Sequence, residues 1–247
     1  MPTETASQAQ RILNHLQIVS AQLALRAASP PLLAKVQALK RYQQARFERS
    51  YADLLQSPRY AGAARFFLEE LYGPGDFSRR DAQFARVVPA LVRLFPAEVV
   101  GTVEQLAQLH GLSEQLDTRM AQQLDSPALD RAAYTRAWQA SASPAEREQQ
   151  IALTLAIGRA MEGFTRKPLL RQALRMMRGP AAAAGLSELQ HFLENGFDTF
   201  KAMQGAQDFL DIVRWREQAL ADALYAPDAL ARLAVCPPGD ESLGQLP

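Results

Sequence analysis

The sequence contains one run of basic residues, between Phe164 and Ser187, in which no acidic residue occurs. Arg171, Arg175 and Arg178 are spaced at i, i+4 and i+7, so they share one face of a helix. The planar fork of an arginine binds a carboxylate or a phosphate with two hydrogen bonds. We therefore expect this basic face to bind an acidic partner protein or an anionic ligand. The predicted binding residues are Arg166, Lys167, Arg171, Arg175 and Arg178.

The same basic face has a second interpretation, in which its cations pair with acids of the same chain. Glu188, Glu194 and Asp198 follow shortly after the basic run. The apolar side of the helix contains Leu169, Leu170, Leu174 and Met177, of which the last three should anchor it. The sequence leaves open whether the arginines bind a partner or only internal acids.

His110 is the histidine that the pattern places toward the interior. Val99, Val103 and Leu106 form the apolar stripe of the predicted helix, and His110 continues that line. Gly111 beside it would admit a close neighbour. A histidine in apolar surroundings can ligate haem iron, and it can equally be a neutral core residue with a hydrogen-bond partner. His110 is thus the candidate cofactor ligand of an alternative, tetrapyrrole-binding function.

Glu188 and His191 form a Glu-x-x-His motif on a predicted helix. Di-iron bundles use two such motifs together with two further glutamates. Neither His15 nor His110 has a glutamate three residues earlier, so this chain has one motif. At ~100° per residue, His191 falls nearly opposite the apolar stripe of its helix. We therefore expect His191 to face solvent and expect no metal site.

Motifs of catalytic nucleophiles and phosphate-binding loops do not occur in the sequence. It has no Gly-x-Ser-x-Gly, and Gly73-Pro74-Gly75 lacks the lysine and the spacing of a phosphate-binding loop. Cys236, the only cysteine, lies close to the end of the chain. A non-enzymatic protein without a cofactor is favoured, and an enzyme that uses a carboxylate pair stays an open alternative.

Residues 66–72 read Phe-Phe-Leu-Glu-Glu-Leu-Tyr. This segment resembles the signature of an uncharacterised bacterial family, the FFLEELY motif proteins. Residues 59–81 around it, and Phe-Asp-Thr-Phe at 197–200, share the resemblance, which covers most of the chain. It implies a bacterial, cytoplasmic, helical protein and supplies no catalytic residue.

The motif also has a structural explanation. Phe67, Leu68 and Leu71 form an apolar stripe that Phe66 widens, whereas the two glutamates fall off this stripe and should be solvated. Gly73 is placed to end the helix in a left-handed conformation. We interpret the motif as a buried helix rather than a binding site.

The composition narrows the class of protein. The chain has 247 residues, of which 48% are hydrophobic, and a net charge of +1, so nucleic acid is not an expected partner. A single cysteine excludes an internal disulfide. The polar N-terminus does not resemble a secretory signal, and no apolar run approaches the ~20 residues that span a bilayer. These features predict a cytoplasmic protein that is not transmembrane.

Prolines and glycines divide the chain into about ten helical segments, and nothing alternates like a strand. The clearest helix start is Ser143-Pro144-Ala145-Glu146, and residues 144–164 after it are apolar on nearly every side, as in the centre of a bundle. The tail from Pro237 is polar and should be disordered. We predict an all-α fold: one large multi-helix bundle in a single domain, residues 1–236, with a disordered tail, residues 237–247.

Overall fold

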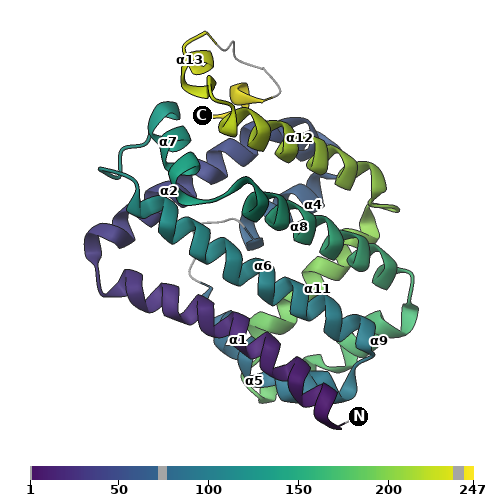
Figure 1. The fold of residues 1–247 in the computed structure, drawn as a ribbon. Helices are drawn as coiled ribbons and strands as arrows, with labels where there is room; N and C mark the ends of the chain where they lie inside the picture. Colours follow the sequence, from purple (N-terminus) through teal and green to yellow (C-terminus); the bar gives the residue numbers. More distant parts are fainter. Residues whose placement is uncertain (1, 72–76, 236–241) are drawn as a thin grey trace.

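The computed structural model describes residues 2–71, 77–235 and 242–247 of the chain (Figure 1). Within these ranges it contains 13 α-helices and no strand, and 83% of the chain is helical. The predicted all-α fold is therefore confirmed. The single-domain organisation stays a prediction.

The longer helices are α1 (Pro2–Ala27), α2 (Pro30–Ser50), α5 (Ser78–Leu94), α6 (Ala97–Gln122), α7 (Arg131–Ser141), α8 (Pro144–Thr165), α9 (Pro168–Met176), α11 (Ser187–Ala202) and α12 (Gln207–Tyr225). Between them lie the short helices α3 (Ala52–Gln56), α4 (Ala61–Phe66), α10 (Arg178–Ala183) and α13 (Ala229–Leu233). A π-helical turn, η1 (Phe67–Leu71), continues α4, and a 3-10 turn, η2 (Leu243–Gln245), lies near the C-terminus.

Helix α6 occupies the middle of the face seen in Figure 1, with α1 on one side of it and α8 on the other. Helix α8 also packs against α12 and α11, and α1 also packs against α5. Helix α9 follows α8 at the edge of the molecule, where it contacts α11. Helices α5, α9 and α11 therefore meet at one end of the fold, and the candidate sites lie there.

The core consists of three groups of buried apolar side chains. One surrounds Phe67 and Phe209, where α4 and η1 meet α8, α11 and α12. A second surrounds Tyr134 and Leu224, between α2, α6, α7 and α12. A third, which includes Ile12, joins α1 to α5 and α6.

The capping box before α8 has the predicted geometry. Ser143 Oγ accepts from the Glu146 backbone N–H at 3.3 Å, and the Glu146 carboxylate accepts from the Ser143 N–H at 2.9 Å. The predicted burial of α8 on nearly every side is wrong, because Ala152 and Arg159 are exposed on its outer face. Alanine is apolar enough to suggest a core position and small enough to be stable at the surface.

The predicted disorder of the C-terminal tail is wrong for residues 242–247. Leu243 and Leu246 are fully buried in the second core group. Ser50 Oγ lies 2.7 Å from Gln245 Oε1, and Arg49 donates to the Leu246 carbonyl at 2.6 Å. These contacts hold the segment against α2. Residues 236–241 of the predicted tail lie outside the described part of the chain.

Candidate functional site

Two arginines of the predicted basic face bind acids of α11. Arg178 Nε donates to both carboxylate oxygens of Glu194, at 2.7 and 2.9 Å. Arg171 pairs with Asp198 and lies 3.6 Å from Glu194. The hydrogen bonds from Arg178 lower the pKa of Glu194 to about 2. These two arginines thus hold α9 and α10 against α11, as the second interpretation of the sequence proposed.

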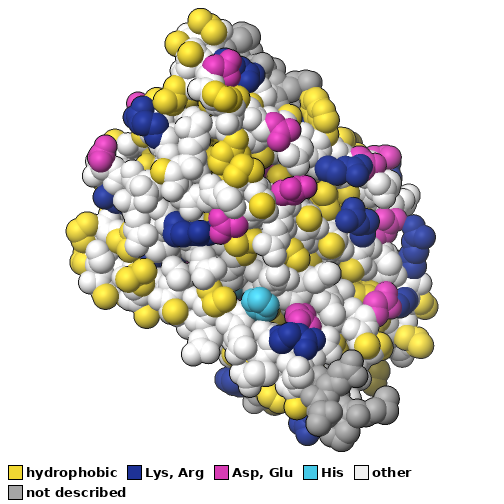
Figure 2. Space-filling model, in the orientation of Figure 1, with side chains coloured by type: hydrophobic (Ala, Val, Ile, Leu, Met, Phe, Trp, Pro, Cys, Tyr) yellow, Lys and Arg dark blue, Asp and Glu magenta, His cyan; other side chains and the backbone are white. Residues whose placement is uncertain are grey.

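The other three predicted residues are nearer to solvent. Arg166 pairs with Glu162 of its own turn at 2.7 Å, and Lys167 pairs with Glu98 of α6. Arg175 is exposed, and it forms no ion pair within the described ranges. Four of the five cations are therefore matched by acids. Basic and acidic side chains also lie next to one another on the face shown in Figure 2.

Helix α9 presents apolar side chains to solvent. None of its residues is fully buried. Leu170 and Leu174 are partly buried, as anchors should be, but Leu169 is 76% exposed and Met176 is 72% exposed. Met177, the third predicted anchor, is also exposed. We call Leu169, Arg175, Met176 and Met177 the α9 face.

His110 connects α6 to α5. Its Nε2 lies 3.0 Å from Asp81 Oδ2, and both side chains are partly buried. The close approach predicted at Gly111 is that of α1: a Cβ atom at this glycine would lie 3.1 Å from the His15 carbonyl oxygen. The geometry matches the simpler interpretation, a half-buried histidine with a polar partner. Its role as a haem ligand stays a prediction.

The described part of the FFLEELY segment, residues 66–71, is divided between α4 and the π turn η1. Phe66 and Phe67 are buried as predicted, and Phe66 stacks on Phe192 with ring centroids 5.5 Å apart. Glu69 is exposed as predicted, but Glu70 is partly buried and binds Arg80, so full solvation of this glutamate is wrong. The predicted cap at Gly73 lies outside the described residues. Single π turns are frequent at functional sites, which makes Glu70 a residue of interest.

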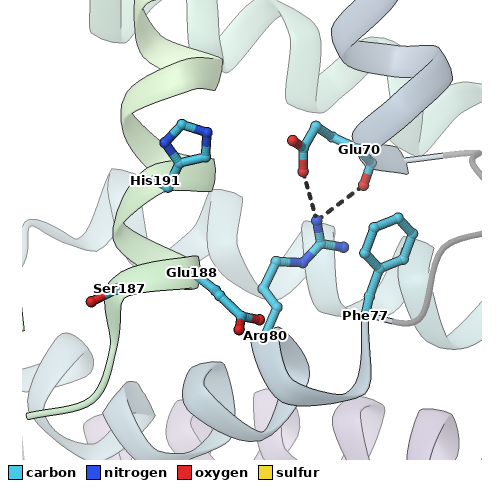
Figure 3. A pocket seen from close by; sticks show the side chains of 6 residues that line it. All are labelled: Glu70, Phe77, Arg80, Ser187, Glu188 and His191. Carbon is cyan, nitrogen blue, oxygen red and sulfur yellow. Dashed lines mark hydrogen bonds and ion pairs between the residues drawn. The ribbon is translucent and has the colours of Figure 1, made fainter. Parts of the chain in front are cut away.

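Arg80 is held at a fixed position beside Glu70 (Figure 3). Its Nη1 donates to the Glu70 carbonyl at 3.0 Å and to the Glu70 carboxylate at 3.3 Å. Its guanidinium lies 4.2 Å from the ring centroid of Phe77 and 4.5 Å from that of Phe192. Burial between these rings lowers the pKa of Arg80.

Arg80 lines a cleft of about 350 Å³ together with residues of η1 and α11. The lining residues are Glu70, Phe77, Arg80, Ser187, Glu188 and His191. A neighbouring hollow of about 280 Å³ shares Ser187 and His191 and reaches Arg178. His191 is exposed as predicted, and Glu188 binds Arg79 at 3.3 Å. Across the ranges that the structure describes, no three Asp, Glu, His or Cys side chains are grouped to hold a metal ion.

Both the α9 face and the cleft lie within a segment that matches a known protein family. The sequence model of one family matches residues 22–230. The chain belongs to the DUF8198 family, a domain of unknown function. No curated protein and no solved structure matches it. Membership of an uncharacterised family is thereby confirmed for this DUF8198 protein, and the FFLEELY family name stays a prediction.

The DUF8198 chain also buries charges that the sequence analysis missed. Arg26 of α1 pairs with Glu114 of α6 and donates to Thr118, and Lys40 of α2 reaches Glu114 at 2.7 Å. Burial alone would raise the pKa of Glu114, but Lys40 and Arg26 lower it to about 2. This network joins three helices. It does not line the cleft, so we assign it to stability rather than binding.

None of the helices in the described ranges is both long and apolar enough to cross a membrane.

Proposed function

We propose that this DUF8198 protein is a non-enzymatic binding protein that docks a partner protein on the α9 face. The observation that carries the proposal is the exposure of Leu169 and Met176, two large apolar side chains two turns apart on one short helix. Exposed apolar side chains that are grouped, rather than scattered, mark interaction sites. The methionines suit this role because their flexible side chains adapt to a partner surface.

The ion pairs favour a protein over a membrane or nucleic acid as the partner. Binding to anionic lipid or to phosphates requires several uncompensated cations. On this surface Arg166, Lys167, Arg171 and Arg178 are paired with acids, whereas Arg175 forms no ion pair with any residue that the structure describes. The partner should therefore offer an apolar stripe for Leu169 and Met176, with an acidic residue beside it for Arg175.

Replacement of both apolar residues tests the proposal. Leu169→Ser/Met176→Ser removes the apolar surface of α9 at exposed positions, so the fold should persist. Leu25→Ser/Leu33→Ser changes two exposed leucines of α1 and α2 and serves as the matched control. Partners are captured with the wild-type protein from lysate of its source cells, and then each purified partner is titrated against all three proteins.

We expect the α9 double variant to weaken the Kd by at least about tenfold, the effect of losing about 1.4 kcal/mol of contact energy. The control variant should bind as the wild type does. Arg175→Glu should also weaken binding, because it places an acid against the acidic residue of the partner. Equal affinities for the wild type and the α9 double variant would refute the proposal.

Haem binding through His110, the alternative that the sequence leaves open, gains no support from the geometry. The Nε2 atom is hydrogen-bonded to Asp81. We therefore do not advance it as a second function.

A further inference from the structure

The cleft between η1, α5 and α11 is separate from the α9 face and shares no residue with it. Figure 3 shows Glu70 and Arg80 on one side of the cleft and Glu188 and His191 on the other. These residues come from parts of the chain that are more than a hundred positions apart.

The acids of the cleft are already paired. The Glu70 carboxylate accepts from Arg80, and Glu188 binds Arg79 of α5. Glu194, which lines the neighbouring hollow, accepts from Arg178 and from the Gln190 side chain. A cationic ligand would have to compete with these internal cations for the carboxylates.

The donors of the cleft are open. Arg80 uses Nη1 for Glu70, whereas its Nε and Nη2 donate to no described residue. The Ser187 hydroxyl and the His191 ring likewise have no hydrogen bond with any residue that the structure describes. The open donors of this cleft are thus those of Arg80, Ser187 and His191, and these are the groups that an anion would use.

Two further features favour an anion at this place. Ser187 begins α11, a helix of 16 residues whose preceding residue, Leu186, forms no side-chain cap; of the first-turn N–H groups, that of Leu189 donates to Gln83 Oε1 at 3.0 Å. Uncapped N–H groups at a helix N-terminus carry partial positive charge. The Phe77 and Phe192 rings also fix the Arg80 guanidinium before any ligand arrives, so little side-chain entropy is lost on binding.

We propose that the cleft binds the oxyanion group of a small organic acid or phosphate monoester through Arg80, Ser187 and His191. A volume of about 350 Å³ lies near the lower end of the ~300–1,000 Å³ typical of ligand sites, so the ligand is a small metabolite. The Phe77 ring supplies an apolar wall for the remainder of the molecule. This inference does not depend on docking at the α9 face.

Histidine NMR tests the proposal directly, because the chain has 3 histidines. Inorganic phosphate and benzoate are titrated separately into the full-length protein at constant pH and ionic strength, and His191→Gln assigns the His191 signal. Phosphate and carboxylate compounds are distinguished by which titration saturates at lower concentration. We expect a saturable shift of the His191 signal as the anion fills the cleft. The His15 and His110 signals should not move.

Two variants locate the binding group. Arg80→Lys keeps the charge but removes the fork, and it should weaken anion binding by at least about tenfold. Arg79→Lys is the matched control, because the Arg79 side chain is 82% exposed and does not line the cleft. Ser187→Ala changes an exposed residue and provides a second test if Arg80→Lys does not fold.

A His191 shift that grows linearly without saturating for both anions would overturn the proposal. Equal affinity of the wild type, Arg80→Lys and Ser187→Ala would also overturn it.

Discussion

Helices α8 and α12 cross at Gly158, which allows a sharp test of the packing. A Cβ atom at Gly158 would lie 2.5 Å from Leu210 Cδ2, and Leu210 is buried. On the same helix, a Cβ atom at Gly163 would meet nothing within 4 Å. The same substitution, Gly→Ala, should therefore stabilise the protein at Gly163 but not at Gly158.

The expected magnitudes follow from two effects. Alanine stabilises a helix interior by roughly 0.5–1 kcal/mol relative to glycine, and less near the end of a helix, where Gly163 lies. Overpacking a well-filled core costs about 1–3 kcal/mol, because Leu210 must move. Gly163→Ala should raise the free energy of unfolding by up to about 1 kcal/mol. Gly158→Ala should leave it unchanged or lower it by up to about 2 kcal/mol.

Urea unfolding followed by circular dichroism measures both changes. A chain of this size should shift its Tm by roughly 2–4 °C for each kcal/mol, so thermal unfolding gives an independent check. If Gly158→Ala stabilised the protein as much as Gly163→Ala, the close contact between α8 and α12 would be refuted.

Three further substitutions test other parts of the fold. Leu155→Asp places a charge in the first core group and should cost several kcal/mol of unfolding free energy, seen as a large drop in Tm. Leu246→Ala should cost about 2–4 kcal/mol if residues 242–247 are packed as described, whereas a disordered tail would show no change. Glu114 has a folded pKa below its unfolded value, so its stabilisation is complete above about pH 4.3 and is lost as the pH falls toward 2. Urea unfolding of Glu114→Gln from pH 7 to 2 should show lower stability at neutral pH and a shallower acid dependence than the wild type; parallel curves would contradict this assignment.

Local features of the fold could be predicted from the sequence. The capping box of Ser143 and Glu146 predicts where α8 begins, because the two residues that hydrogen-bond to each other are only three positions apart. The outward direction of His191 follows from the position of the apolar residues on its own helix. Such predictions depend on spacing within one element, which the sequence contains in full.

Contacts between distant segments could not be predicted in the same way. Arg80 of α5 meets Glu70 of the π turn η1, and it meets the α11 residues only through packing. The pairing of Arg26 with Glu114 likewise depends on how α1 crosses α6. The acids that might bind Arg171 and Arg178 could be named from the sequence, but whether they did so depended on the α9–α11 contact.

The exposed faces of α8 and α9 could not be predicted from the spacing of their apolar residues. An apolar residue at helical spacing is expected in the core, yet Leu169 and Met176 have the right spacing and face solvent. Among the residues that the structure describes, no helix covers these two side chains. This departure from the usual pattern is the main reason for assigning a binding function to the helix.

The most direct test of the docking function is photo-crosslinking in the source cells. A benzoylphenylalanine is introduced in place of Met176 in one strain and in place of Leu25 in another, and adducts are identified by mass spectrometry after irradiation. We predict one partner protein crosslinked through position 176 and not through position 25, with its acidic residues near the linked site. Absence of an adduct at 176, or the same adducts at both positions, would contradict docking on the α9 face.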